Sequence, residues 1–152
     1  MNQEDKELLL QVFSSVFEDF AFMFVEEATD WEPEKPGACL RAKIDFMGRD
    51  KKGSLQIVAP LDICTETAQN VLGTEPEELP SDAGENALKE LANIACSCLL
   101  AEKFGVDETF DISIPETRSF PEKKWGKLFE NPRYAAMLVD ESPFLVTFDC
   151  KG

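Results

Sequence analysis

The chain contains no histidine among its 152 residues. Histidine is the usual general base for serine and cysteine nucleophiles and a frequent zinc ligand, so its absence excludes Ser/His and Cys/His catalysis and histidine-containing zinc sites. The eight glycines are scattered and form no glycine-rich phosphate-binding loop. Much of conventional enzyme chemistry is therefore excluded.

Long apolar runs are also absent, and basic residues are outnumbered. The longest unbroken apolar stretch, residues 20–25, is far too short to span a membrane, and residues 1–7 are acidic where a signal peptide would be basic. The 15 Lys and Arg against 30 Asp and Glu give a net charge of −15, which repels phosphate backbones and anionic lipid surfaces. We therefore expect a cytoplasmic protein with no nucleic-acid partner and no membrane insertion.

Cysteine occurs five times, but without the Cys-x-x-Cys spacing of redox and zinc motifs. The odd number and the expected cytoplasmic location favour reduced thiols over disulfides. Cys96 and Cys98 are two residues apart, which on a helix separates their side chains by about 200° and prevents them from binding one ion together. The acidic clusters lack the spacing of a calcium loop, so we expect no metal site and no cofactor in this chain.

The rest of the composition is that of a globular chain. The length suits one domain over residues 1–152, with roughly 70% of the surface of the unfolded chain buried on folding. Apolar residues spaced by three and four predict a long amphipathic helix from residue 3 to about residue 28. Two prolines within residues 30–37, a segment that also contains Trp31, are expected to break this helix.

Further along the chain, strand and helix patterns alternate. The predicted elements are strands at 39–46 and 54–58, helices at 61–72 and 82–104, and strands at 110–114, 134–139 and 144–148. Residues 51–53 and 140–143 suit hairpin turns. Gly73 suits the left-handed end of the helix before it, and Asp82 with Glu85 suits a capping box at the start of the next helix. The predicted order is helix, two strands, two helices, three strands.

Basic residues are concentrated in a stretch between residues 114 and 134 that is expected to be irregular. Five of the fifteen Lys and Arg lie there: Arg118, Lys123, Lys124, Lys127 and Arg133. The loop 118–133 is thus a local reversal of charge on an acidic chain. Two interpretations stay open: a solvated loop of mixed charge, since glutamates lie among the basic residues, and a loop that contacts a partner.

The helix predicted at 82–104 presents an unusual polar face. At 100° per residue, four polar side chains line up opposite the face expected to be buried: Asn86, Glu90, Asn93 and Ser97. A solvated helix face ordinarily favours Lys and Glu, whereas this one has short amides, a hydroxyl and one carboxylate. Leu100 and Cys96 are expected to point outward beside it. Small polar groups beside exposed apolar ones suggest a docking surface.

Glu90 and Asn93 are three residues apart, so their side chains leave the helix as neighbours, about 5–6 Å apart at Cβ. The carboxylate can pair with a cation. The carboxamide has a donor and an acceptor but does not titrate, so it can orient what it contacts, for example a water molecule that attacks a phosphorus atom. Glu-x-x-Asn is a common spacing on its own, and an ordinary helix surface is the alternative interpretation.

Residues 86–100, with Glu90 and Asn93 in a helix that follows two strands and a short helix, resemble the Glu-x-x-Asn helix of the CheC/CheX/FliY chemotaxis phosphatases. Residues 16–25 are similar to the opening helix of that family, and residues 60–73 are similar to its middle helix. The resemblance covers about the first two thirds of the chain and is weaker in the terminal strands.

The likeness is closest to the CheX-like branch, whose members have a single site. The CheC branch carries a second Glu-x-x-Asn pair on its first helix, whereas here Glu18 is followed three residues later by Ala21. Asn86 departs from the family pattern, as do Cys96 and Ser97 where relatives often have glycine. These departures leave the identity of the partner open.

The resemblance implies an α+β fold of two layers, with long helices packed on an antiparallel sheet in a single CheX-like domain, residues 1–152. It also implies hydrolysis of the aspartyl phosphate on a CheY-like response-regulator receiver domain. Asn93 would orient the attacking water, and Glu90 would pair with the receiver's active-site lysine. The partner-binding residues would be Asn86, Ser97 and Leu100. The Mg²⁺ needed for the reaction would be held by the receiver.

Two other functions stay open at this point. The same fold could bind a receiver without hydrolysing its phosphoryl group. It could also be a dimerisation domain in which Leu100 and the edge of the terminal strand pack against a second copy. CheX-type relatives suggest a homodimer, so dimerisation and phosphatase activity are compatible.

Overall fold

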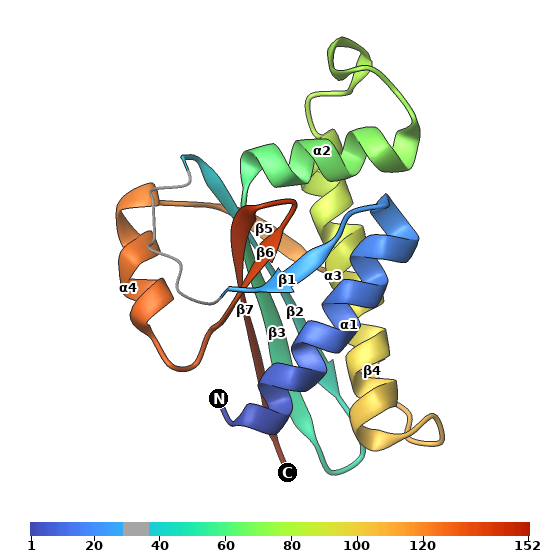
Figure 1. The fold of residues 1–152 in the computed structure, drawn as a ribbon. Helices are drawn as coiled ribbons and strands as arrows, with labels where there is room; N and C mark the ends of the chain where they lie inside the picture. The colour runs from blue at the N-terminus through green and yellow to red at the C-terminus, as the bar shows by residue number, and fades with distance from the viewer. Residues whose placement is uncertain (29–36) are drawn as a thin grey trace.

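The computed structural model describes residues 1–28 and 37–152 (Figure 1). The helices are α1 (Gln3–Ala21), α2 (Leu61–Leu72), α3 (Ala83–Phe104) and α4 (Trp125–Glu130), with 3-10 turns η1 (Pro76–Glu78) and η2 (Glu122–Lys124). The strands are β1 (Val25–Glu27), β2 (Cys39–Met47), β3 (Lys52–Pro60), β4 (Asp111–Ile112), β5 (Glu116–Phe120), β6 (Ala135–Val139) and β7 (Ser142–Lys151). The strands form one antiparallel sheet in the order β1-β6-β7-β3-β2-β4, and β5 also pairs with β2. The predicted α+β fold, with long helices on an antiparallel sheet, is confirmed.

The two faces of the sheet are covered unequally. Helices α1 and α3 lie on one face of the sheet, and alternate residues of β2, β3 and β7 join their buried apolar side chains in one core. On that face Ala42, Ile44 and Phe46 of β2 are buried, and Leu40 is half-buried. The opposite face carries a smaller cluster, in which Trp125 of α4 packs with Val58 and its neighbours. The helical layer therefore holds the larger core, and α3 is embedded in it.

Helix α1 is shorter than the sequence pattern predicts. Phe22 takes a left-handed conformation (φ 56°), and its backbone N–H donates to the carbonyl of Glu18 at 3.2 Å. The Phe22 bond is the 5→1 bond of an αL-type helix end, and the N–H of Met23 also donates to the carbonyl of Phe17 at 3.2 Å. Residues 25–27 then form β1 and pair with β6. Apolar side chains therefore continue past residue 21, but they belong to a turn and an edge strand.

The turn predicted at 140–143 is confirmed and is very tight. Val139 pairs with Ser142, so the loop consists of Asp140 and Glu141, both with positive φ (47° and 70°), as in a type I′ hairpin. Strand β7 pairs with β6 on one side and with β3 on the other. The edge of the terminal strand is thus covered by β6 over residues 142–146, whereas residues 147–151 pair only with β3. A dimer contact through the edge of the terminal strand therefore stays a prediction, limited to residues 147–151.

Two other connections differ in detail from the prediction. Met47 pairs with Lys52, so the loop between β2 and β3 is residues 48–51 and not 51–53. The strand expected at 110–114 keeps only two strand residues, because the chain leaves the sheet after Ile112. Ser113 still contacts β2: its N–H donates to the carbonyl of Asp45 at 2.8 Å, and its hydroxyl accepts from the Asp45 N–H at 2.9 Å.

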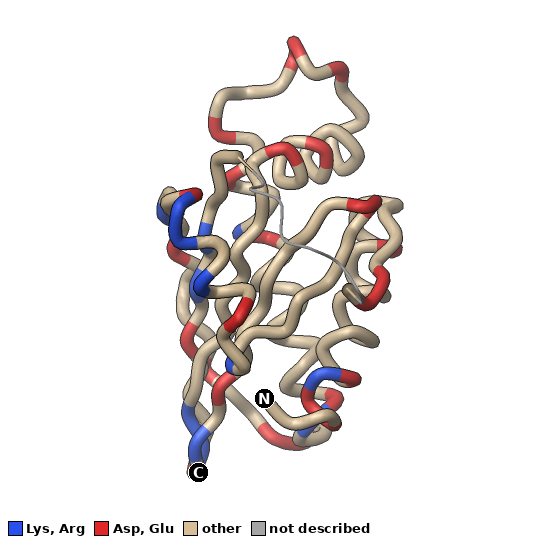
Figure 2. Tube along the Cα trace, turned by 60° about the vertical axis from the view of Figure 1, so that its left-hand side comes forward, with Lys and Arg blue, Asp and Glu red and all other residues tan. Residues whose placement is uncertain are grey.

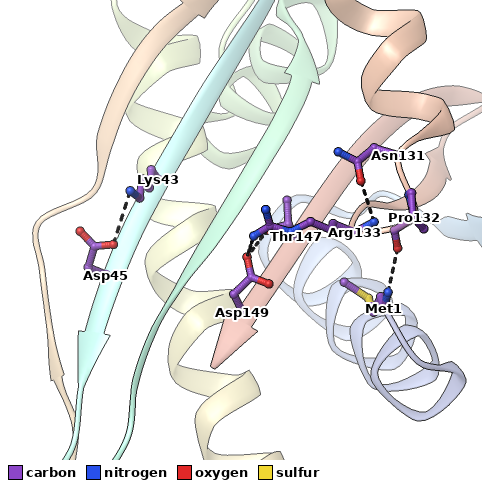
Figure 3. Close-up of polar contacts among 8 residues, drawn as sticks. All are labelled: Met1, Lys43, Asp45, Asn131, Pro132, Arg133, Thr147 and Asp149. Atoms are coloured by element: carbon purple, nitrogen blue, oxygen red, sulfur yellow. Dashed lines mark hydrogen bonds and ion pairs between the residues drawn. The ribbon is translucent and has the colours of Figure 1, made fainter. Parts of the chain in front are cut away.

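The stretch expected to be irregular between residues 114 and 134 has regular structure. Strand β5 adds to the edge of the sheet beside β2, and η2 and α4 follow it. Trp125 at the start of α4 is 1% exposed, in agreement with a role in closing the core. Arg133 is held against β7, where its guanidinium donates to Asp149 at 2.7 Å (Figure 3). This basic residue is therefore part of the structure and is not a free loop charge.

The N-terminus is tied to the same region. The Met1 ammonium donates to the carbonyl of Pro132 at 2.8 Å, next to the contacts of Arg133 (Figure 3). The predicted break at 30–37, including Trp31, lies outside the described residues apart from Gly37. Within residues 1–28 and 37–152, no helix is long and apolar enough to cross a membrane.

Candidate active site

Helix α3 is covered on several sides. It packs against α1, α2 and the sheet, and one row of small residues lets α2 approach closely. At Gly84 an added Cβ would lie 3.4 Å from the backbone of Cys64, so the two helices are nearly in backbone contact there. The buried residues of α3 are Ala83, Gly84, Ala87, Leu88, Leu91, Ala92, Ala95, Cys96, Leu99 and Leu100. One narrow face of the helix remains exposed to solvent.

That exposed face is the polar row expected from the sequence. Asn86, Glu90, Asn93 and Ser97 are all exposed, at successive turns of α3. Within the described part of the chain, neither Glu90 nor Asn93 has a hydrogen-bond or ion-pair partner. A long helix embedded in the core therefore presents a carboxylate and a carboxamide whose polar atoms are free to meet another molecule.

Leu100 and Cys96 do not belong to this face, and the prediction that they point outward is wrong. Leu100 is 4% exposed and Cys96 is fully buried, both within the main core. The helical wheel assumed a single buried side. After α3 the chain turns back to add β4 beside β2, and Phe110 and Ile112 then pack against the core that holds Leu100. Leu100 is therefore not accessible to a partner.

The start of α3 also differs from the prediction. Asp82 precedes the helix, but its side chain makes no capping hydrogen bond. The Glu85 carboxylate instead accepts a hydrogen bond from the Thr117 hydroxyl of β5 and lies 3.8 Å from the Lys89 ammonium. The Glu85–Thr117 hydrogen bond thus connects the first turns of α3 to strand β5 at the edge of the sheet. It helps to fix the position of the helix segment that carries the polar row.

A hollow of about 450 Å³ with a mixed polar and apolar lining lies on one flank of the row. It is lined by Asn86, Lys89, Glu90, Asn93, Ile112, Ser113, Ile114 and Pro115. Ile114 is 86% exposed here, although its side chain is large and apolar. The sequence pattern assigned residue 114 to a strand, so its place beside Asn93 could not be predicted; it follows from the early end of β4.

A second hollow, of about 270 Å³, lies on the other flank, between α1, α2 and α3. Its lining is mainly apolar: Phe20, Ala68, Val71, Leu72, Pro80, Asp82, Ala83, Asn86, Ala87 and Glu90. Asn86 and Glu90 line both hollows. Glu90 therefore stands on a ridge with a hollow of mixed lining on one side and a mainly apolar hollow on the other.

The surroundings of this ridge are strongly acidic. Residues 61–90 contain eight Asp and Glu and one Lys, a net charge of 1 − 8 = −7 out of −15 for the chain. Figure 2 shows this separation: acidic residues mark α2 and the loop above it, whereas most basic residues lie toward α4 and the far end of the sheet. The candidate site thus lies within a negative surface that favours a basic partner.

The buried cysteine thiols are unreactive at neutral pH. All five are free, as the sequence predicts. Burial raises the pKa of the Cys64 and Cys96 thiols to about 12, and burial with the nearby Glu122 raises the pKa of Cys39 to about 11. Because the thiolate is the reactive form, these three are not nucleophiles at neutral pH. Within residues 1–28 and 37–152, no group of three or more Cys, Asp or Glu could hold a metal ion.

No family model and no curated protein matches the chain, whereas solved structures match it in fold. Chemotaxis protein CheX from Vibrio vulnificus is 15% identical, with a TM-score of 0.69 over 95% of each chain. A CheC-like superfamily protein from Shewanella sp. PV-4 is 18% identical, with a TM-score of 0.65 over the whole of each chain. A chain of the CheX-CheY-BeF3-Mg²⁺ complex from Borrelia burgdorferi is 16% identical, with a TM-score of 0.61 over 96% of this chain and 97% of that one.

The molecule is thus a two-layer α+β protein with an exposed Glu-x-x-Asn pair on its most deeply embedded helix. Its fold is that of the CheX and CheC-like chemotaxis proteins, as the resemblance of residues 86–100 implies.

Proposed function

We propose that this protein is a phosphatase that hydrolyses the aspartyl phosphate of a CheY-like receiver domain. The observation that carries the proposal is the Glu90–Asn93 pair, exposed and unpartnered in the described part of the chain, on a helix fixed by its own core. The CheX relative from Borrelia burgdorferi forms a complex with CheY, BeF3 and Mg²⁺, and this supports a receiver as partner.

In this proposal Asn93 supplies the orienting group. Its carboxamide donates to and accepts from one water molecule and holds it in line with the phosphorus. The water oxygen forms a bond to phosphorus, the bond from phosphorus to the aspartate oxygen breaks, and the bonding electrons return to the aspartate as a carboxylate. The water's proton leaves with the phosphate. The amide itself does not titrate, so it acts by position alone.

Glu90 fixes the partner. Its carboxylate pairs with the ammonium of the receiver's active-site lysine, which sets the phosphoryl group over Asn93 one helical turn away. The Mg²⁺ belongs to the receiver's acidic pocket. The exposed Asn86 and Ser97 extend the contact along the row. The acidic surface around Glu90 favours a lysine over a neutral group at this position.

The test is the decay of a phosphorylated receiver, loaded by a small phosphodonor, in the presence of each variant. Asn93→Ala is expected to lower the rate constant of dephosphorylation by about 10²–10³, by analogy with loss of one oriented hydrogen-bond donor. Binding of the same variant to a BeF3-loaded receiver should change little. Gln11→Ala, which removes an exposed amide from α1, is the matched control and should retain wild-type decay.

A non-catalytic receiver-binding module is the alternative, and the same assay separates it. Such a protein would bind the loaded receiver while the phosphoryl group decays at the receiver's own rate. In that case Glu90→Ala would still weaken binding, but Asn93→Ala would have no rate to remove. Retention of wild-type decay by Asn93→Ala would overturn the assignment of Asn93.

A further inference from the structure

We propose that the apolar hollow beside Glu90 is a specificity pocket, which receives an apolar side chain that the receiver carries next to its active-site lysine. This inference rests on the proposed function, since it identifies which receivers the site accepts. The hollow is separate from the group that orients the water, because Asn93 lines only the mixed hollow on the other side of the ridge.

The hollow follows from a contrast in side-chain size. Its base consists of alanines, and Ala68, Ala83 and Ala87 form a small buried cluster of their own. Its rim is made by larger side chains, Phe20 from α1 with Val71 and Leu72 from α2. Small residues where α2 meets α3 and large ones around them leave a depression of about 270 Å³, which suits a single apolar side chain.

The rim is apolar although water reaches it. Val71 is 41% exposed and Leu72 is 54% exposed, and both lie at the end of α2 where a polar residue would satisfy the helix equally well. Scattered exposed apolar residues need no explanation, but these border one hollow that adjoins an unpartnered carboxylate. Burying such side chains in a complex contributes binding free energy in proportion to the apolar area covered.

The position of Glu90 links the pocket to the receiver. Because Glu90 lines both hollows, a partner whose lysine meets Glu90 and whose phosphoryl group meets Asn93 lies at the border of the apolar hollow. The occupant is therefore a side chain that neighbours the lysine on the receiver surface. Receivers with a charged or very small residue there should be poor substrates.

Charge argues against a second copy of this chain as the occupant. A two-fold interface at this hollow would bring together two surfaces that each carry −7 over residues 61–90. A receiver that presents a lysine there is complementary to the same surface. The apolar pocket and the acidic rim together define the partner as basic and apolar at adjacent positions.

The experiment compares the double variant Val71→Ser/Leu72→Ser with wild type. Binding to a BeF3-loaded receiver is measured by calorimetry, and KM and kcat are measured from receiver dephosphorylation. The variant should raise Kd and KM about tenfold or more and leave kcat within about twofold of wild type. Leu61→Ser/Val106→Ser removes two exposed apolar side chains (43% and 86% exposed) that lie outside the hollow, and it should match wild type. Thermal unfolding shows that each variant is folded.

Each outcome decides between the two proposals. Unchanged Kd and KM in Val71→Ser/Leu72→Ser, with wild-type dephosphorylation intact, would overturn the pocket and leave the phosphatase proposal standing. Weaker binding by the variant, with no dephosphorylation by wild type, would keep the pocket and overturn the phosphatase. A dimer in sedimentation that the double variant dissociates, without loss of receiver binding, would assign the hollow to a second copy and overturn the pocket.

Discussion

At the scale of single residues, two carboxyl groups meet where α2 approaches the β6–β7 turn. The pKa of Glu66 is raised above its ordinary value of 4.5, first by burial and then by the charge of Asp140 and a hydrogen bond with it. Asp140 is itself held in place, since its carboxylate accepts from the N–H of Phe24 at 3.3 Å. The folded protein thus holds a proton at this pair that the unfolded chain releases more readily.

This pair makes stability depend on pH with a defined sign. Between pH 4.5 and the raised pKa of Glu66, the folded state binds more protons than the unfolded state, so this group's contribution to stability falls as pH rises and is lost above the raised pKa. Glu66→Gln keeps a hydrogen-bond donor toward Asp140 without a charge. We expect this variant to be more stable than wild type at pH 8 in urea unfolding, and the gain should disappear as pH falls to 4.5.

A control variant is needed because, in a chain of charge −15, removing any carboxylate charge lowers the general repulsion and raises stability. Glu102→Gln removes an exposed carboxylate on α3 away from the pair and serves as the control. A gain for Glu66→Gln that stays constant between pH 8 and 4.5, or that the control reproduces, would contradict a specific role for the Glu66–Asp140 contact.

Residue patterns predicted the exposed pair Glu90 and Asn93 but not all its neighbours. The exposure of Glu90 and Asn93 followed from their azimuth on an amphipathic helix, a local property that the sequence encodes directly. Leu100 was misplaced because α3 packs against α1, α2 and the sheet, so more than one side of the helix is buried, and this depends on tertiary packing. Ile114 and the rim of the apolar hollow were not predicted, since they reach Glu90 only through tertiary packing.

At the scale of elements, the long helices and the central strands were predictable and the ends were not. Helix α2 stops at Gly73, which reads directly from the sequence because glycine favours the left-handed conformation found there (φ 65°). Helix α1 stops in the same conformation at Phe22, and phenylalanine carries no such signal. Strands β1 and β5 were missed because short edge strands have little periodicity and exist through their pairing.

Substitutions at the ends of α1 and α2 are expected to change the free energy of unfolding in opposite directions. Phe22 is 74% exposed and left-handed, so Phe22→Gly should relieve backbone strain and raise the free energy of unfolding by up to about 1 kcal/mol. Gly73→Ala places a Cβ at a left-handed position with open space around it and should lower that free energy by about 1 kcal/mol. Urea unfolding of both variants checks the pair of signs. A loss of stability in Phe22→Gly would show that the aromatic ring contributes packing despite its exposure.

At the scale of the whole molecule, charge is divided between two sides (Figure 2). The acidic side holds α2, the loop after it and the ridge with Glu90, whereas α4 and its 3-10 turn gather Lys123, Lys124 and Lys127 on the other side. If the charge of −15 were spread evenly over the surface, it would slow the approach of another acidic protein but would not orient any partner. A divided one can orient a partner whose basic patch faces the candidate site before any contact is made.

This division predicts how receiver association responds to salt. If the acidic side steers the receiver, raising NaCl from 50 to 500 mM should lower the association rate constant about tenfold in stopped-flow fluorescence. Glu77→Lys/Glu78→Lys, in the exposed turn η1 outside both hollows, should lower the rate at low salt and flatten the salt dependence. Glu122→Lys/Glu130→Lys makes the same change of net charge on the α4 side and should not slow association. A rate that rises with salt, or equal effects of the two double variants, would mean that total charge and not its placement governs the encounter.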